Sequence, residues 1–472
     1  MKIYLVNPPA MKGVRMVREG RCMQRAGAWT AVWAPISLAL IAGVLEAEGH
    51  IVKLTDCIVE NVDSLSLAAQ AASFRPDLVV LNTATPSITS DLEQAGAIKN
   101  VCHGARVAAF GIHVTALPEE SLKSGAHVDY LVRGEPEVTV RELVRANLNP
   151  AGIAGLSWRR DDRIVNEPDR EPISELDSLP FPAWHLVDRK RYIMPFTDRP
   201  FLLVATGRGC PHRCGFCADT AFYGRALRLR SPQKVAEEME WVGKQFGIKD
   251  FLFWSESFTL KREYAIQVCE AILKRSLKTK WVANSRVDDV DPELLKLMKR
   301  AGCWVIGYGV EAGTDRALHL MRKNVTVETI RRAIEQTVDA GIGAVAHCVL
   351  GYPGETEADI METIHFVESL PLDFAQFYCA VPFPGSALFE EARQNDWINT
   401  ADWTRFEQNH SVLDTPWISA RRVMELRELA FRRFYLRPRA FISAARYISN
   451  PGVAIRMARM LWDFRDWIKT GA

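Results

Sequence analysis

Three cysteines within eight residues form the part of the sequence best suited to chemistry. Cys210, Cys214 and Cys217 lie in a glycine-rich loop directly behind an apolar run. A closed structural metal site takes four protein ligands, whereas three thiolates on a four-iron cluster leave one iron free to bind an exchangeable group. The spacing therefore predicts an iron–sulfur cluster with one open iron. The alternative is a zinc site completed by a distant His or Cys, but zinc sites favour paired C-x2-C units and no second pair is present.

The C-x3-C-x2-C spacing behind a strand, with the aromatic Phe216 before the last cysteine, resembles the radical S-adenosylmethionine (SAM) superfamily. The resemblance implies that Cys210, Cys214 and Cys217 bind a [4Fe-4S] cluster and that S-adenosylmethionine binds its open iron. In that family one electron from the cluster cleaves S-adenosylmethionine to a 5′-deoxyadenosyl radical. The resemblance also implies a partial (β/α)6 barrel, with function gathered at the carboxyl ends of its strands.

From residue 201 onward the sequence has the alternation of apolar runs and helical stretches that such a barrel requires. Helices are expected at 232–246 and 326–340. Strands are expected at 201–205, 250–253, 281–284, 305–309, 344–350 and 374–380.

Three charged residues that follow these strands are candidate ligands of S-adenosylmethionine. Glu256 stands where the family has a Gly-Gly-Glu segment for the cofactor's amino group, although Trp and Ser replace both glycines. Arg286 could pair with the cofactor's carboxylate or form a structural salt bridge. The resemblance implies that Glu311 accepts hydrogen bonds from both ribose hydroxyls, and a helix-capping acid is the alternative. No residue is identified as a catalytic acid or base, because the lone histidines His347 and His410 are expected to be structural.

The first 145 residues also alternate strands and helices, which predicts a parallel, doubly wound sheet. Strands are expected at 3–6, 50–55, 78–81 and 107–110, and helices at 36–47, 65–74 and 92–101. A ligand of this fold binds beyond the carboxyl ends of the strands. Small and polar residues at those ends would leave room for a large flat ligand: Asn82, Thr83, Thr85, Gly111, His113, Gly134 and Glu135.

The segment from Gly111 to Thr139, with its G-x-H and G-E-P-E runs, resembles the cobalamin-binding domain that precedes the radical domain in one large subgroup. The resemblance implies cobalamin as a further cofactor. A flavodoxin-like domain with another ligand is the alternative on fold analogy alone. The D-x-H-x-x-G motif that lends cobalt an imidazole is absent, because Asn7-Pro8-Pro9 follows the first strand. We therefore expect cobalamin without a histidine ligand at this position, with His113 beside the corrin rim.

A chain of 472 residues predicts several domains. We expect a cobalamin-binding domain at 1–145, a proline-rich linker at 146–196, a radical SAM core at 197–395 and a helical C-terminal region at 396–472. A hydrophobic content of 48% and a charged content of 25%, with no run of 18 apolar residues, are typical of a soluble globular protein. Seven scattered further cysteines favour a reducing, cytoplasmic location over a disulfide framework.

The C-terminal region is basic, and this charge has two interpretations. Residues 421–472 hold 12 Lys and Arg but 4 Asp and Glu, a net charge of +8. Apolar residues recur at helical spacing in 421–436 and 453–469. These helices are expected to pack on the barrel, and the alternative is a basic surface that contacts a membrane or admits a lipid substrate. Nucleic acid is not expected, since no recognised binding module accompanies the charge.

Together these patterns predict an α/β protein with a Rossmann-like cobalamin domain, a partial (β/α)6 barrel of the TIM type and a helical C-terminal extension. The resemblance implies a cobalamin-dependent radical SAM enzyme that methylates an unactivated carbon of a small-molecule or lipid substrate, with an external one-electron reductant such as flavodoxin or ferredoxin. An enzyme that cyclises, rearranges a ring or couples carbons without net methylation is the first alternative, with a lipid or tetrapyrrole among its candidate substrates. A cobalamin- or zinc-binding regulatory protein is the second. The sequence does not identify the substrate.

Overall fold

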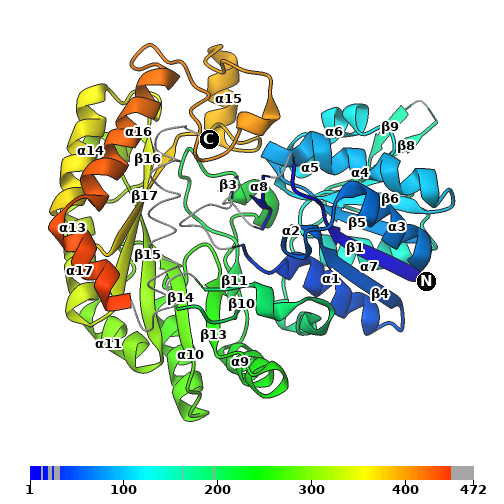
Figure 1. Cartoon of the computed structure of the whole chain (residues 1–472), viewed down its shortest axis with the longest axis horizontal. Helices are drawn as coiled ribbons and strands as arrows, with labels where there is room; N and C mark the ends of the chain where they lie inside the picture. Colours follow the sequence, from blue (N-terminus) through cyan, green and yellow to red (C-terminus); the bar gives the residue numbers. More distant parts are fainter. Residues whose placement is uncertain (12–13, 20–23, 26–31, 162, 195–196, 448–472) are drawn as a thin grey trace.

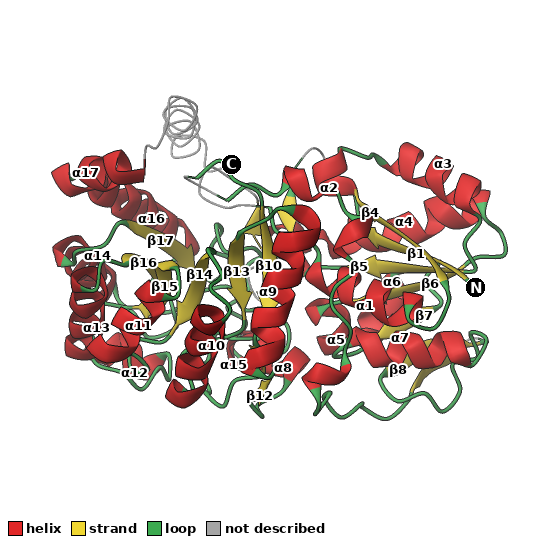
Figure 2. Ribbon diagram, turned by 90° about the horizontal axis from the view of Figure 1, so that it is seen from below, coloured by secondary structure: helices red, strands yellow, loops and turns green. Residues whose placement is uncertain are grey.

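The computed structural model describes the chain except for residues 12–13, 20–23, 26–31, 162, 195–196 and 448–472. Figure 1 shows two α/β bodies side by side, a smaller N-terminal one in blue and cyan and a larger one in green to orange. Figure 2 shows helices on the outer faces of both sheets. We call these bodies the first domain and the barrel domain.

The first domain is built on a seven-stranded sheet with the order β4-β1-β5-β6-β7-β8-β9. Its parallel strands are β1 (Lys2–Asn7), β4 (Ile51–Asp56), β5 (Leu78–Asn82), β6 (Arg106–Phe110) and β7 (Tyr130–Val132). The main helices are α1 (Ile36–Glu46), α3 (Ser64–Phe74), α4 (Ile88–Val101), α5 (Ile112–Ala116), α6 (Pro118–Ser124) and α7 (Pro136–Arg145). Strand β1 lies between β4 and β5, so the winding direction reverses there, and ligands of such sheets bind at this switch point. The predicted doubly wound sheet is confirmed.

The stretch predicted as a linker contributes to this sheet. Strands β8 (Leu156–Arg160) and β9 (Arg163–Asn166) form an antiparallel hairpin, and β8 pairs with the edge strand β7. An unpaired edge presents a row of unsatisfied backbone groups, and the hairpin supplies partners for those of β7. The part of the predicted linker that includes residues 156–166 therefore belongs to the first sheet.

The barrel domain contains six parallel strands in sequence order. They are β10 (Phe201–Ala205), β13 (Asp250–Trp254), β14 (Lys280–Ser285), β15 (Cys303–Glu311), β16 (Gly343–Leu350) and β17 (Phe374–Cys379). The helices between and after them are α8 (Asp219–Tyr223), α9 (Pro232–Phe246), α10 (Arg262–Lys274), α11 (Pro292–Arg300), α12 (Asp315–Leu320), α13 (Val327–Asp339), α14 (Glu357–Ser369) and α15 (Ala387–Gln394). The two outer strands, β10 and β17, are not neighbours in the sheet order, so this is the partial barrel that the sequence predicts.

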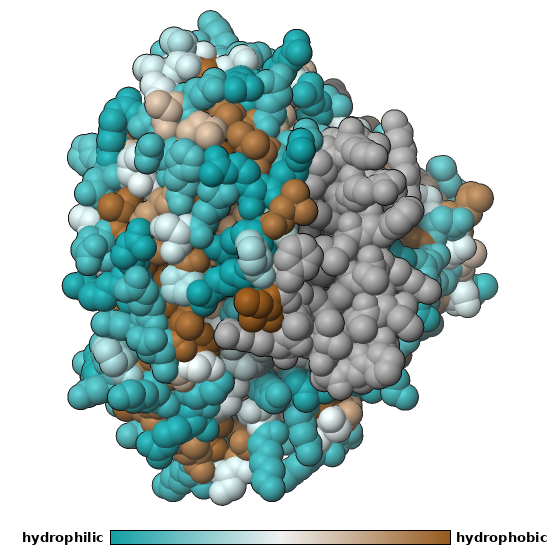
Figure 3. Space-filling view, turned by 60° about the vertical axis from the view of Figure 1, so that its left-hand side comes forward, coloured by the Kyte–Doolittle hydropathy of each residue, from teal (hydrophilic) through white to brown (hydrophobic). Residues whose placement is uncertain are grey.

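The helix α16 (Ala420–Tyr435) packs on β17 and α14 through a mainly apolar face, and its basic side chains add ion pairs. Arg422 pairs with Glu357 and Arg433 with Glu368, each at 2.6 Å, and both acids lie on α14. These ion pairs favour the packing interpretation of the basic charge. Figure 3, with the barrel side brought forward, shows mainly hydrophilic residues with scattered hydrophobic groups. The second predicted C-terminal helix, 453–469, lies outside the described residues.

A bilayer-spanning helix would need a long apolar segment, and none of the helices in the described part of the chain is long and apolar enough.

Buried ion pairs join the two domains beside the cysteine loop. Strands β11 (Gly207–Arg208) and β12 (Arg228–Leu229) each contribute an arginine. Arg208 contacts Glu137 at 2.5 Å and Glu135 at 3.0 Å, and Arg228 contacts Glu135 at 2.5 Å. None of the four side chains is more than 9% exposed. Because Arg208 lies two positions before the first cysteine, these pairs fix the cysteine loop on the first domain.

We expect Glu137→Gln to lower the free energy of unfolding by about 3 kcal/mol, because it removes one counter-charge from a buried guanidinium. Glu135 remains as a partner of Arg208, so the loss of stability should lie at the lower end of the range for a broken buried ion pair. Urea denaturation of the two proteins under anaerobic conditions measures the difference.

Glu425→Gln is the matched control, because Glu425 pairs with Arg421 and Arg422 on the exposed face of α16. Exposed ion pairs contribute little to stability, so this variant should unfold like the wild type. Equal stabilities for the two variants would contradict a structural role for the buried pairs.

Candidate active site

The carboxyl ends of the barrel strands surround a cavity of about 350 Å³. The structure brings six of the predicted site residues together in its wall: Cys210, Cys214, Cys217, Glu256, Arg286 and Glu311. They come from loops that follow β10, β13 and β14 and from the last residue of β15. The meeting of these groups in one cavity follows from the common direction of the parallel strands.

The cysteine loop is held in place by backbone contacts to distant segments. The amide of Gly215 donates to the carbonyl of Met321 at 3.0 Å, and its carbonyl accepts from the amide of Leu388 at 2.8 Å. A Cβ at position 215 would collide with the hydroxyl of Tyr352. Glycine at this position therefore lets Tyr352, from the loop after β16, pack directly on the cysteine loop.

The three predicted ligands are more exposed than most of the other described cysteines, although Cys102 is also half-buried. Cys210, Cys214 and Cys217 are half-buried, whereas Cys57, Cys269, Cys303, Cys348 and Cys379 are buried. Burial raises the pKa of Cys269 and of Cys379 to about 12. Since the thiolate is the metal ligand, those buried thiols are poor ligands at neutral pH.

The arrangement of the loop fits the cluster that the sequence implies. Among the described residues, no group of three or more His, Cys, Asp or Glu side chains is arranged to hold one metal ion. Cysteine ligands of a four-iron cluster each bind a different iron and need not converge on one point. Three half-buried thiols on one loop, all lining the cavity, therefore fit the cluster implied by the sequence.

Glu311 carries its carboxylate into the cavity from a strained backbone. It is the last residue of β15, where the pairing with β16 shifts register, and its φ is 62°. A non-glycine residue in this left-handed region costs about 1 kcal/mol or more. Its Oε1 accepts a hydrogen bond from Nζ of Lys323 at 2.6 Å, and both side chains are at most 8% exposed. A Cβ on Gly309 would collide with both charged groups.

Glu311 does not cap the following helix. The N-cap of α12 is Thr314, whose hydroxyl accepts from the amide of Ala317 at 3.1 Å. Lys323, the counter-ion of Glu311, was missed by the sequence analysis. No pattern around Lys323 in the sequence predicts this role, because Lys323 reaches Glu311 only when the turn after α12 folds back onto the barrel.

The sequence left two roles open for Arg286, and in the structure this residue forms the salt bridge. Its Nε and Nη2 donate to the carboxylate of Asp288 at 2.9 and 2.8 Å. Nη2 also donates to the carbonyl of Lys323 at 3.0 Å. The guanidinium therefore ties the loop after β14 to the turn that carries Lys323, while it still lines the cavity.

The predicted cobalamin contacts lie apart from this cavity, at the carboxyl ends of the first sheet, and none of them lines it. Asn82 donates to Glu19 at 3.3 Å, and the hydroxyl of Thr83 donates to the carbonyl of Phe110 at 2.8 Å. Thr85 begins a short 3-10 helix, residues 85–87.

Three further predicted cobalamin contacts lie in turns that follow β6 and β7. The φ of Gly111 is 144°, and a Cβ there would collide with the carbonyl of Thr83. Gly134 donates its amide to the hydroxyl of Thr115 at 3.0 Å. Glu135 is engaged in the ion pairs with Arg208 and Arg228, so its carboxylate serves domain docking.

His113 is a buried polar group of this edge. Its Nδ1 is buried without a partner among the described residues, and its ring packs edge-on against Trp403 at 4.7 Å between centroids. Burial lowers the pKa of His113 to about 4, so the imidazole is neutral at physiological pH. An unsatisfied buried donor or acceptor is costly, and a bound polar ligand would relieve that cost. The edge therefore fits a ligand with polar groups on its rim, as cobalamin has.

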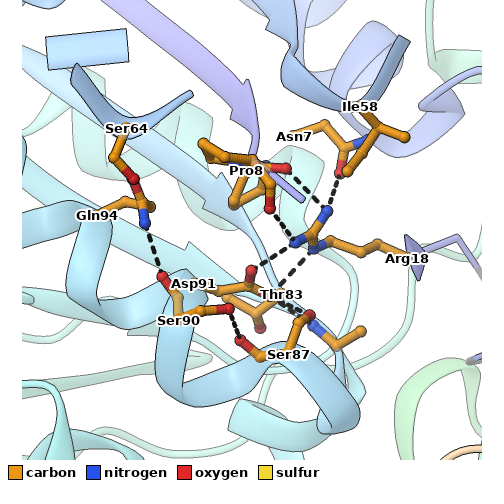
Figure 4. Close-up of polar contacts among 12 residues, drawn as sticks. Asn7, Pro8, Arg18, Ile58, Ser64, Thr83, Ser87, Ser90, Asp91 and Gln94 are labelled. Atoms are coloured by element: carbon orange, nitrogen blue, oxygen red, sulfur yellow. Dashed lines mark hydrogen bonds and ion pairs between the residues drawn. The ribbon is translucent and has the colours of Figure 1, made fainter. Parts of the chain in front are cut away.

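A buried ion pair lies at the switch point between β1 and β5. Figure 4 shows Arg18 against Asp91 and the loop after β1. The guanidinium contacts Asp91 at 2.7 Å and donates to the carbonyl of Pro8 at 2.9 Å, and both charged side chains are fully buried. This loop replaces the histidine motif, so it offers cobalt no imidazole.

Comparisons with known proteins agree with these features. The family model described as the radical SAM superfamily matches residues 204–367, and the model of the B12 binding domain matches residues 27–144. A solved structure of the radical S-adenosylmethionine methyltransferase TsrM from Kitasatospora setae, with cobalamin and a [4Fe-4S] cluster bound, covers 85% of this chain and 76% of its own, with a TM-score of 0.67 and 20% identity. At that identity the likeness shows the fold alone.

Two curated relatives align over most of the chain. An uncharacterized methyltransferase of Pyrococcus horikoshii is 31% identical over 445 residues, which are 94% of each chain. An anaerobic magnesium-protoporphyrin IX monomethyl ester cyclase of Cereibacter sphaeroides is 28% identical and covers 100% of this chain and 75% of its own. Agreement of this extent, over both domains and their order, means that the chain belongs to the radical SAM superfamily, among its enzymes with an N-terminal B12-binding domain.

Proposed function

We propose that this enzyme transfers a methyl group to an unactivated carbon of a small-molecule substrate. The observation that carries the proposal is the docking of the first domain on the cysteine loop through Arg208, Glu135 and Glu137. This contact holds the ligand edge of a B12-binding domain and the cluster loop in a fixed relation. The methyltransferase relative, which covers both domains, supports the same reaction class.

The cyclase relative supports a second candidate function, a reaction without net methylation. It aligns with the whole chain, so the same two domains also accompany ring formation in that protein. A carbon-coupling, cyclising or rearranging reaction without net methylation is therefore the alternative.

In this proposal each cofactor has residues that fit it. Cys210, Cys214 and Cys217 would hold a [4Fe-4S] cluster, and the strand ends of the first domain with His113 would hold cobalamin. When bound, these groups supply the electron that cleaves S-adenosylmethionine and the methyl group that the substrate receives. Glu311 would accept the ribose hydroxyls of S-adenosylmethionine, with Lys323 as its counter-ion. Glu256 and Arg286 would orient its amino and carboxylate groups.

Such an enzyme requires a small-molecule substrate and a reductant. We infer an external one-electron donor, flavodoxin or ferredoxin, and a reducing cytoplasmic setting that preserves the cluster. A lipid substrate or contact with a membrane would be a more specific proposal. The ion pairs of Arg422 and Arg433 with α14 do not support it, because they engage these basic side chains within the protein.

The first test is iron content. Anaerobic reconstitution should yield about four irons per chain, the number in the expected cluster type. The triple variant Cys210→Ala, Cys214→Ala, Cys217→Ala should lose the iron and the production of 5′-deoxyadenosine. Cys102→Ala is the control, because Cys102 is a partly exposed thiol outside the loop, and it should keep both. Stoichiometric zinc in place of iron, or a triple variant with normal iron, would contradict the assignment.

The second test concerns Glu311. Glu311→Gln keeps the size of the side chain but removes charge-assisted hydrogen bonds of about 1.5 to 3 kcal/mol each. The dissociation constant of S-adenosylmethionine should rise at least about tenfold, measured by equilibrium dialysis against cluster-loaded protein. Glu357→Gln on the outer helix α14 should leave it unchanged. Wild-type affinity in Glu311→Gln, with iron content intact, would remove Glu311 from the cofactor site.

The third test separates methylation from the alternative through reaction products. An enzyme that uses one molecule of S-adenosylmethionine for hydrogen abstraction and a second as methyl source forms 5′-deoxyadenosine and S-adenosylhomocysteine in equal amounts. Chromatography of a reaction with substrate-containing host extract should show both products rising in step. Rising 5′-deoxyadenosine without S-adenosylhomocysteine, while the substrate is consumed, would favour cyclisation or rearrangement.

A further inference from the structure

The outer side of the cysteine loop reaches solvent. Pro211 and Arg213, which lie between the first two cysteines, are exposed, whereas Gly215 is buried. The three cysteines are half-buried and line the cavity. A cluster held by them would therefore be separated from solvent on this side by little more than the loop itself. Because electron transfer slows steeply with distance, a protein that donates an electron to the cluster has to dock close to this loop.

A second exposed arginine, Arg225, lies beside the start of the loop. It follows Gly224, whose carbonyl accepts a hydrogen bond from the amide of Cys210 at 3.4 Å. The next residue, Ala226, also touches the loop, because a Cβ on Gly209 would lie 2.3 Å from the carbonyl oxygen of Ala226. The segment after α8 therefore packs directly against the backbone that leads into the first cysteine.

A third exposed arginine, Arg322, lies in the turn after α12. It follows Met321, whose carbonyl accepts from the amide of Gly215 at 3.0 Å. The φ of Arg322 is 57°, a left-handed conformation that is uncommon for a residue with a side chain. This turn therefore presents one cation, Arg322, to solvent beside the cysteine loop and the next, Lys323, to the cavity.

The three arginines are not neutralised by ion pairs within the described part of the chain. The side chains of Arg213, Arg225 and Arg322 form neither an ion pair nor a hydrogen bond there. Arg316 on α12, by contrast, pairs with Asp359 at 2.6 Å. The whole chain has a net charge of +2, so three unpaired guanidinium groups around one loop are a local concentration of positive charge.

Helix α15 borders the same loop and carries charges of both signs. The amide of Leu388 donates to the carbonyl of Gly215 at 2.8 Å, which places the start of the helix against the loop. The helix carries Glu390 and Glu391 together with Arg393. Among the described residues, neither acid pairs with an arginine of the loop or its neighbours. The helix therefore reduces the positive charge of this surface without cancelling it.

We propose that Arg213, Arg225 and Arg322 form the docking surface for an acidic one-electron donor protein. The inference rests on the proposed function, since it gives the reductant of that reaction a binding site. One electron leaves the donor, which is oxidised by one electron, and the cluster held by the cysteine loop accepts it. The small exposed residues Pro211 and Ala226 allow the donor to approach the loop closely. Electron-transfer complexes have small interfaces, and complementary charge sets their orientation and association rate.

Binding tests the surface directly. Full-length, cluster-loaded protein is titrated anaerobically with flavodoxin, an acidic donor protein, and binding is followed by flavin fluorescence. The triple variant Arg213→Glu, Arg225→Glu, Arg322→Glu should bind about tenfold more weakly, because three weak attractions become repulsions. Added salt should weaken binding to the wild type, since it screens exposed charges. Lysozyme, a basic protein, should not bind.

A matched control reverses three exposed charges on the outer helices α11 and α13. Lys296→Glu, Arg300→Glu and Arg332→Glu change the net charge by the same amount as the first triple variant, and none of the three side chains pairs with another described residue. This variant should bind flavodoxin nearly as tightly as the wild type, because its reversed charges lie away from the cysteine loop.

Two reductants separate docking from cluster chemistry. Formation of 5′-deoxyadenosine is measured with subsaturating reduced flavodoxin and, separately, with dithionite, a small ion that needs no docking surface. The first triple variant should lose about tenfold in the flavodoxin-driven rate and keep the dithionite-driven rate. Arg213 lies between two cluster ligands, so the double variant Arg225→Glu, Arg322→Glu, which leaves the loop sequence intact, is measured as well. It should show a smaller loss of the same kind with normal iron content.

The outcomes separate this inference from the proposed function. Wild-type flavodoxin affinity in both the triple and the double variant, or an equal loss in the control on α11 and α13, overturns the docking surface. An equal fall of the dithionite-driven rate at normal iron content also overturns it, because the arginines would then act on the cluster. Phosphatidylglycerol vesicles are titrated in parallel, and loss of vesicle binding alone would assign the surface to a membrane and overturn the proposal. If the wild type forms no 5′-deoxyadenosine with dithionite, the proposed function fails, whereas the flavodoxin titration still decides whether the surface binds an acidic protein.

Discussion

The buried ion pairs of Arg208 and Arg228 with Glu135 and Glu137 are the constraint on which the site depends. Removal of two guanidinium groups and two carboxylates from water is costly, and only close mutual contacts compensate for it. Those contacts exist in one relative placement of the domains. The cysteine loop, which follows Arg208 directly, is therefore positioned by the first domain as well as by the barrel. The cysteine loop in turn lines the cavity that contains the candidate ligands of S-adenosylmethionine.

Much of the fold could be predicted from sequence because parallel strands buried on both faces are continuous apolar runs. Phe201–Ala205 and Pro232–Phe246 have the predicted bounds, and most other predicted elements differ by a few residues at the ends. The hairpin at 156–166 was missed because its strands are short and half-exposed, within a stretch that prolines mark as irregular. Chain order and periodicity therefore predicted the two sheets but not the hairpin that pairs with the edge of the first sheet.

The candidate site was predictable where the chemistry is local and unpredictable where it depends on distant partners. The three cysteines lie in one loop, so their spacing can be recognised from the sequence. Glu311 could be predicted because it stands at the end of an apolar strand. The pairing of Glu311 with Lys323 and the role of Glu135 depend on turns and on the second domain. For Glu135, resemblance predicts a cobalamin contact, whereas the structure places its carboxylate in ion pairs, so the cobalamin role stays a prediction.

The contact between Gly215 and Tyr352 has a consequence for engineering and for evolutionary drift. The two positions lie far apart in sequence, yet the tyrosine hydroxyl occupies the space that any side chain at 215 would need. A cysteine loop grafted from another enzyme of this superfamily would carry its own residue at that point and could not accept this tyrosine unless that residue were glycine. A side chain at position 215 is therefore permitted only after Tyr352 has changed. The cysteine loop and the loop after β16 form one transferable unit, although most of the barrel domain separates them along the chain.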